Sequence, residues 1–127
     1  MISLARKNAE KMGVQNVEFI HSKINATPIT GDSIDCVMSN CVLNLVPEED
    51  KLSVIKEIHR MLRPCGRLAI SDFLAIKPLP AHMKNDPDLI SGCVGGAIEV
   101  GVMERLLVEI GFDGRRHAVI LGSFWLT

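Results

Sequence analysis

The chain has 127 residues, 14 basic and 15 acidic side chains, a net charge of −1 and 47% hydrophobic residues, which suffices for one domain with a single core. The near-neutral charge argues against nucleic acid or an anionic membrane surface as the main partner, because both select for basic faces. No apolar run approaches the roughly 18 residues of a membrane span, and the charged N-terminal stretch lacks the apolar centre of a secretory signal.

The first half of the sequence predicts two helices and two short strands. Apolar residues at helical spacing predict a helix over residues 2–12, and Gly13 is the type of residue that ends one. Apolar runs predict strands over 17–21 and 34–39, with turn residues between them. A proline followed by three acidic residues opens an amphipathic helix over 47–63, because the helix dipole favours negative charge in the first turn.

The second half continues the alternation of strands and helices. A mostly apolar strand is predicted over 67–74, and three prolines mark an irregular or short-helix segment over 78–87. A further helix is predicted over 102–110, and a last strand over 118–121. The alternating order indicates an α/β fold with a parallel sheet and helices on its faces.

In parallel sheets of this kind, ligands bind beyond the carboxyl ends of the strands. The candidates for a site are therefore the residues at the ends of the predicted strands, namely 22–25, 40–44 and the residues from Asp72 onward, where Ser71-Asp72 interrupts the third strand. For Asp72 itself, a role in the turn at the strand end is the simpler interpretation.

Two of the four cysteines lie in unusual surroundings. Cys41 follows the second strand between two carboxamides, Asn40 and Asn44. Cys93 lies in a segment with three glycines, which allow a backbone to approach a ligand closely. The thiolate is the reactive and metal-binding form of cysteine. Spacing alone leaves the commoner alternative open, in which a free cysteine is a small buried apolar residue.

The other two cysteines have more ordinary surroundings. Cys36 lies within an apolar strand, where we expect it in the core, and Cys65 lies in a Pro-Cys-Gly turn. The sequence has no CxxC pair, which argues against a zinc ribbon or a thioredoxin motif. Free thiols are typical of a reducing compartment, so we expect a cytoplasmic protein.

Four segments carry the most specific sequence pattern: Ser39-Asn40-Cys41-Val42-Leu43-Asn44-Leu45-Val46-Pro47, Arg60-Met61-Leu62-Arg63-Pro64-Cys65-Gly66-Arg67-Leu68, Ile70-Ser71-Asp72 and Gly92-Cys93-Val94-Gly95-Gly96-Ala97. Together they resemble the arsenite methyltransferases, which belong to the S-adenosylmethionine-dependent methyltransferases. The Leu-Arg-Pro-x-Gly-Arg-Leu part is shared across that superfamily. The Asn-Cys-Val-x-Asn-Leu motif combined with Gly-Cys-Val-x-Gly-Ala is much more specific. The similarity extends from the first helix to about Phe112.

The resemblance implies that Cys41 and Cys93 are two ligands of trivalent arsenic, and that a third ligand comes from a segment upstream of the residues present. Trivalent arsenic is soft and prefers sulfur to carboxylate oxygen. Its lone pair attacks the methyl group of a sulfonium, so no general base is needed and positioning supplies most of the catalysis. A site that excludes water also favours the loss of the sulfonium charge.

The resemblance also implies S-adenosylmethionine as the cofactor, with Asn40 against its amino-acid part and Ile24 and Asn25 facing the adenine. The main cofactor anchor of this fold is a glycine-rich loop after the first strand, followed by an acidic residue that binds the ribose. The sequence contains no Gly-x-Gly, and Asn25 stands where the family usually has an acid. We therefore expect a partial doubly wound, Rossmann-like methyltransferase fold, N-terminally truncated, that lacks the first two strands and the glycine-rich loop and forms a single partial domain over 1–127.

The absence of two inner strands would leave unpaired edges on the strands predicted over 17–21 and 34–39. Unpaired backbone groups between apolar faces are costly, so either the two strands close onto each other or a second copy of the chain fills the gap. We expect a homodimer, with an exchanged segment as one way to form it.

Two functions are consistent with these observations. The first is an arsenite methyltransferase in which this chain supplies the acceptor half and is inactive alone. The second is a non-catalytic protein, or dimerising pseudo-enzyme, that binds arsenite or another thiophilic metalloid through its thiols. A quinone or sterol methyltransferase is a weaker alternative, because carbon and oxygen acceptors need no thiols at 41 and 93.

Overall fold

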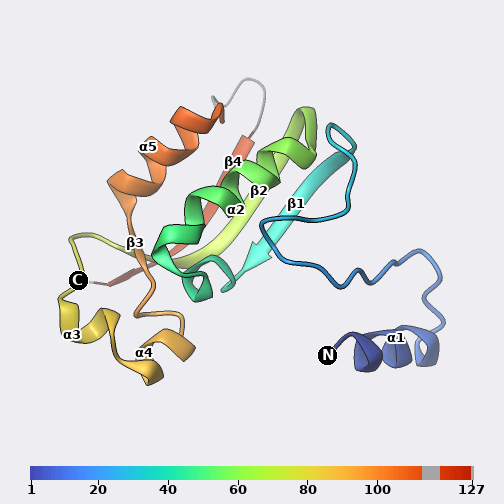
Figure 1. The fold of residues 1–127 in the computed structure, drawn as a ribbon, viewed down its shortest axis with the longest axis horizontal. Helices are drawn as coiled ribbons and strands as arrows, with labels where there is room; N and C mark the ends of the chain where they lie inside the picture. Colours follow the sequence, from blue (N-terminus) through green and yellow to red (C-terminus); the bar gives the residue numbers. More distant parts are fainter. Residues whose placement is uncertain (113–117, 127) are drawn as a thin grey trace.

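The computed structural model describes residues 1–112 and 118–126, and side chains over residues 1–112. Figure 1 shows the elements in chain order. They are α1 (Ile2–Lys11), β1 (Ile34–Asn40), the 3-10 helix η1 (Leu43–Leu45), α2 (Glu48–Met61), β2 (Leu62–Ala75), α3 (Ala81–Lys84), α4 (Pro87–Ser91), β3 (Ile98–Glu99), α5 (Val100–Ile110) and β4 (Ala118–Leu126).

The described strands form one parallel sheet with β2 at its centre, as the alternating pattern predicts. β1 pairs with β2 in a register that runs from Cys36 opposite Arg67 to Asn40 opposite Ser71. β4 pairs with the other edge of β2 along Arg67 to Ala75, and β3 pairs with the last two residues of β2. Both β2 and β4 are longer than predicted, because pairing on their neighbours extends them beyond their most apolar stretches.

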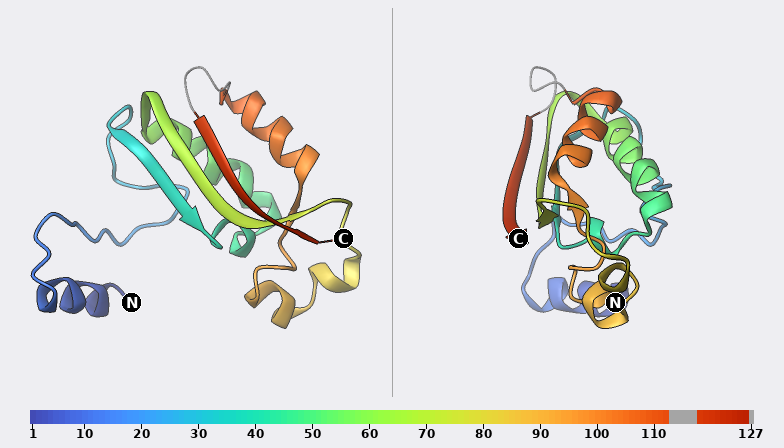
Figure 2. Two further views of the ribbon diagram at one scale, coloured as in Figure 1. Left: turned by 180° about the vertical axis from the view of Figure 1, so that it is seen from behind. Right: turned by 90° about the vertical axis from the view of Figure 1, so that its left-hand side faces the viewer.

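The hydrophobic core lies between the sheet and two helices. α2 and α5 lie on one face of the sheet, as Figure 2 shows. Alternate residues of β2 point toward them, so Leu68, Ile70 and Leu74 are buried. The helices contribute residues at helical spacing, among them Ile55 and Met103. Burying a side chain of this size stabilises the fold by about 1.5–3 kcal/mol, so packing on this face makes a large contribution to stability.

The N-terminal part of the chain is arranged differently. α1 stands apart from the sheet (Figure 1), and none of its residues is buried. Gly13 follows it with a φ of 69°, which confirms the predicted helix end. The strand predicted over 17–21 is wrong: these residues form no strand, and Val17 and Ile20 are 47% and 40% exposed. A strand needs a neighbour for its backbone groups, and no described strand pairs with this segment.

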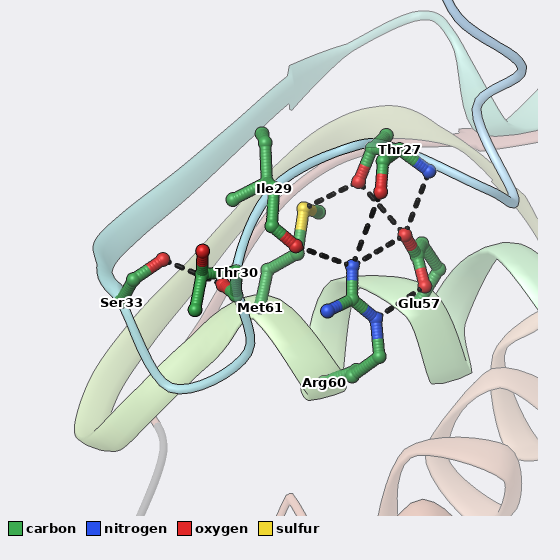
Figure 3. Close-up of polar contacts among 7 residues, drawn as sticks. All are labelled: Thr27, Ile29, Thr30, Ser33, Glu57, Arg60 and Met61. Atoms are coloured by element: carbon green, nitrogen blue, oxygen red, sulfur yellow. Dashed lines mark hydrogen bonds and ion pairs between the residues drawn. The ribbon is translucent and has the colours of Figure 1, made fainter.

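The segment that leads into β1 is fastened to α2 by a polar network (Figure 3). Glu57 accepts hydrogen bonds from the backbone N–H of Thr27 at 2.8 Å and from its hydroxyl at 2.7 Å. Arg60 forms an ion pair with Glu57 at 2.7 Å and donates to the carbonyl oxygen of Ile29 at 2.8 Å. The hydrogen bonds from Arg60 and Thr27 lower the pKa of Glu57 to about 2.

Within residues 1–112 and 118–126, none of the helices combines the length and apolar character that crossing a membrane requires.

Candidate functional site

Cys41 and Cys93 meet at the carboxyl end of β1. Cys41 directly follows β1, and its backbone N–H donates to the carbonyl oxygen of Ser71 at 2.8 Å, one residue beyond the strand. Cys93 lies in the loop between α4 and β3. Its Sγ donates a hydrogen bond of 3.1 Å to the carbonyl oxygen of Cys41, across 52 residues of sequence. The fold therefore joins the two thiol-bearing loops where a parallel sheet binds its ligands.

Both cysteines adopt a backbone conformation that residues with side chains rarely use. Cys41 has a φ of 54° and Cys93 a φ of 64°. This left-handed conformation costs about 1–3 kcal/mol per residue and clusters at functional sites. At Cys41 it turns the chain sharply from β1 into η1, so the thiol lies at the point where the strand ends.

The loop that carries Cys41 is held by two buried charged side chains. Asp72 is 3% exposed, and its Oδ2 accepts a hydrogen bond of 3.2 Å from the backbone N–H of Leu43. Lys51 donates from Nζ to the carbonyl oxygens of Leu43 at 2.9 Å and Val46 at 2.6 Å. Burial raises the pKa of Asp72 and lowers that of Lys51, because both lose water around the charged form. Asp72 is thus a buried residue within β2, and the turn role considered for it is wrong.

Asn44 connects the two loops. Its side chain is 2% exposed and donates from Nδ2 to the carbonyl oxygen of Phe73 at 2.8 Å and to that of Cys93 at 2.9 Å. The backbones approach closely at Gly96, where a Cβ would lie 1.9 Å from the carbonyl oxygen of Asn44. Sequence reasoning noted this carboxamide beside Cys41 but missed its partners, because they lie on distant segments.

The Cys93 thiol is buried, and burial raises its pKa. The nearby Cys41 side chain raises the pKa further, through charge and hydrogen bonding. Cys93 is therefore a neutral thiol at ordinary pH, and a soft ion that binds it must displace the proton.

The Cys41 and Cys93 side chains lie close enough to interact with each other. No group of three or more His, Cys, Asp or Glu side chains in the described part of the chain is arranged to hold a metal ion. Cys36 is half-buried in β1, and Cys65 is exposed. The turn predicted at Cys65 is wrong, because the residue lies within β2; its φ of 66° falls where the register of β1 and β2 shifts. Neither shares the surroundings of Cys41 and Cys93.

The residues that the resemblance assigns to S-adenosylmethionine supply only part of a cofactor site. Asn40 is the exposed last residue of β1, next to Cys41. Ile24 is exposed, and the side-chain amide of Asn25 already donates to the hydroxyl of Ser53 at 3.2 Å. The sequence has no Gly-x-Gly motif, whose glycines would let the backbone come close to the cofactor. The residues present do not fit the whole cofactor, and they account for no methyl-transfer step by themselves.

Comparisons with known proteins place these features in context. The family described as methyltransferase domain matches residues 1–115. The chain is 43% identical over 113 residues to an arsenite methyltransferase of Halobacterium salinarum, which covers 89% of this chain and 28% of that protein. An arsenite methyltransferase of Homo sapiens is 40% identical over 108 residues, with 81% and 28% of the two chains covered.

The fold is similar to the crystal structure of an arsenic(III) S-adenosylmethionine methyltransferase from Chlamydomonas reinhardtii. The TM-score is 0.70 at 32% sequence identity, and the match covers 82% of this chain and 36% of the solved one. The chain thus spans about a third or less of the length of these proteins.

Proposed function

The chain belongs to the methyltransferase-domain family, and from that premise we propose that it binds trivalent arsenic, as arsenite, through Cys41 and Cys93. The observation that carries the proposal is the junction of the two loops, with Cys93 Sγ 3.1 Å from the carbonyl oxygen of Cys41. The similarity of the chain to arsenite methyltransferases supports arsenic over other soft ions as the bound element. Sulfur ligands suit arsenic, whereas the buried carboxylate of Asp72 is engaged with backbone N–H groups.

The binding reaction balances without an added base. Each thiol replaces one hydroxide of arsenous acid, its proton leaves with that hydroxide as water, and an arsenic–sulfur bond forms. Two such exchanges yield a bis-thiolate that retains one hydroxide and the arsenic lone pair. Because the thiols must be reduced to react, we assign the chain to the cytoplasm, where free thiols persist.

Within this proposal, the chain is the acceptor half of an arsenite methyltransferase reaction and does not methylate alone. S-adenosylmethionine, when bound, supplies an electrophilic methyl group, while the residues of this chain hold the acceptor in place. The incomplete cofactor site supports inactivity alone, since the Asn25 amide is engaged with Ser53. The same observation favours a second function, in which the chain is a non-catalytic protein that binds arsenite or another thiophilic metalloid.

Arsenite calorimetry tests the thiol site. The wild-type chain should bind one arsenite, and the double variant Cys41→Ser, Cys93→Ser should not. The matched control is Cys36→Ser, Cys65→Ser, which removes the other two thiols and should bind like the wild type. Binding that survives in the Cys41→Ser, Cys93→Ser variant would remove the thiol site from consideration.

Calorimetry with S-adenosylmethionine, together with a product assay, tests whether the isolated chain is inactive. The chain alone should show no binding at micromolar cofactor and no methylated arsenic product. Turnover would contradict inactivity of the isolated chain and identify it as an enzyme, and cofactor binding at micromolar concentration would contradict an incomplete cofactor site.

We also propose that the chain forms a homodimer, with an exchanged segment as one route. β1 is paired on one side only among the described strands, and its Met38 is 81% exposed. α1 stands apart from the sheet and has no buried residue, so it is available to pack against a second copy of the chain. Light scattering over a range of concentrations should give a dimer mass, and a monomer mass at high concentration would contradict the proposal.

A further inference from the structure

We propose that Asn44 is a positioning residue that holds the Cys41 and Cys93 thiols at the separation needed to chelate one arsenic atom. This inference rests on the proposed arsenite site and adds the residue that makes it a two-thiol site. Asn44 does not itself bind arsenic.

The contacts of Asn44 reach three segments of the chain. The residue lies in η1, three positions after Cys41. One hydrogen bond from Nδ2 reaches the carbonyl oxygen of Phe73 in β2 at 2.8 Å. The other reaches the carbonyl oxygen of Cys93 at 2.9 Å. One side-chain amide therefore uses both of its N–H donors to join the two thiol-bearing loops to the sheet.

The Cys41 side of this connection is rigid. Asp72 accepts from the backbone N–H of Leu43 at 3.2 Å, and Lys51 donates to the carbonyl oxygen of the same residue at 2.9 Å. Both peptide groups of Leu43 are thus fixed, and Asn44 follows directly. Because the backbone next to Asn44 is held in this way, the Asn44 side-chain amide can fix the position of Cys93 relative to Cys41.

The Cys93 side is held by a close approach as well as by the amide. A Cβ on Gly96 would lie 1.9 Å from the carbonyl oxygen of Asn44, so the two backbones are in direct contact there. The Cys93 thiol also donates to the carbonyl oxygen of Cys41. Of these connections, only the Asn44 amide can be removed by a side-chain substitution that leaves both thiols and Gly96 in place.

The side-chain oxygen of Asn44 has no hydrogen-bond partner within the described residues, which indicates that the residue's role depends on its two N–H donors. Its Oδ1 is buried without a hydrogen-bond partner among the described atoms. A buried unpaired acceptor costs about 1–3 kcal/mol, which an apolar residue of similar shape would avoid. The cost is consistent with a residue retained for the connection that its two N–H groups make.

Chelation separates a positioning role from a purely structural one. Two thiols held at a fixed separation act at a high effective concentration toward an atom that binds both. A reagent that modifies one thiol gains nothing from the separation. Loss of the Asn44 bridge should therefore weaken a two-thiol ligand while leaving single-thiol chemistry nearly unchanged.

The test compares phenylarsine oxide, which binds two thiols, with N-ethylmaleimide, which alkylates one. In Asn44→Leu, the affinity for phenylarsine oxide should fall at least about tenfold. The alkylation rate of Cys41, measured by peptide mass spectrometry, should change less than about threefold. Asn85→Leu, at an exposed asparagine after α3, is the matched control and should behave as wild type in both assays.

Two further measurements keep the test decisive if Asn44→Leu does not fold. Asn44→Ser retains a shorter donor that cannot span both carbonyls, and it should show the same loss of two-thiol affinity. In the wild-type protein, the side-chain amide protons of Asn44 should exchange with solvent more slowly than those of exposed Asn85. Equal exchange rates, or full phenylarsine oxide affinity in a folded Asn44 variant, would overturn the positioning role alone. Failure of the wild type to bind would overturn the proposed function itself.

Discussion

Glu57 on α2 accepts two hydrogen bonds from Thr27, one from its backbone N–H at 2.8 Å and one from its hydroxyl at 2.7 Å. This pair ties the segment before β1 to the helix that covers the sheet (Figure 3). Glu57→Gln should lower the free energy of unfolding by about 1–3 kcal/mol, because it removes a charge-assisted acceptor from a partly buried network. Urea denaturation checks this, with Glu49→Gln at the exposed start of α2 as control.

The same carboxylate should make stability depend on acidity. Its native pKa is about 2, below the usual range for a glutamate, mainly because of Arg60. The ionised Glu57 side chain therefore stabilises the fold fully above its unfolded-state pKa of about 4.3. This stabilisation is lost as the pH falls toward the pKa of Glu57 in the folded protein. Between those limits, wild-type stability should fall more steeply than that of Glu57→Gln. Parallel curves for the two proteins would show that Glu57 is not the group responsible.

Gly96→Ala should separate the two thiol-bearing loops. The added Cβ would lie 1.9 Å from the carbonyl oxygen of Asn44, a backbone atom that cannot move alone. We expect a loss of about 2 kcal/mol or more in stability and a weaker arsenite site, both measurable by denaturation and calorimetry. Gly101→Ala is a matched control within α5 and should stabilise the protein by about 0.5–1 kcal/mol. Normal arsenite affinity in Gly96→Ala would show that the close approach is dispensable.

Lys51→Met tests the support of the Cys41 loop. The Lys51 ammonium donates to two carbonyl oxygens at the ends of η1, and both would lose their partner in the variant. We expect a loss of about 1–3 kcal/mol and faster backbone hydrogen exchange over 42–46. Lys56→Met, on the exposed face of the same helix, should be neutral. Unchanged exchange over the loop would assign its rigidity to Asp72 instead.

Arsenite affinity should have a characteristic dependence on pH. A neutral thiol supplies the proton that leaves with arsenic-bound hydroxide, so affinity is constant while Cys93 is protonated and falls once it ionises. Burial raises the pKa of Cys93, which extends the constant range upward. Calorimetry should find equal affinity between about pH 6 and 8 and a decline well above it. An affinity that rises steadily across that interval would contradict binding to neutral thiols.

The sequence predicted those elements whose signals are local. The helices at α1, α2 and α5 carry apolar spacing and end signals, among them Gly111 with a φ of 115°. The strand predicted over 17–21 failed because an apolar run does not reveal whether a neighbouring strand exists. β3 was missed because two residues carry no period.

The candidate site was predictable only at its two thiols. Cys41 and Cys93 stand in recognisable motifs, and the structure brings their loops into contact. The residues that join those loops could not be identified in the same way. Asn44 and Asp72 depend on partners 29 to 49 positions away, and such pairings arise only when the sheet has formed.

The left-handed backbone at Cys41 sets the stability of the turn against the presence of a thiol there. Glycine would suit this conformation better than any residue with a side chain, so Cys41→Gly should fold about as well as the wild type or slightly better. That variant would also lose one of the two thiols of the proposed arsenite site. If the proposed arsenic site is correct, the most stable residue for this turn and the one needed for binding therefore differ, and the protein carries the less stable one.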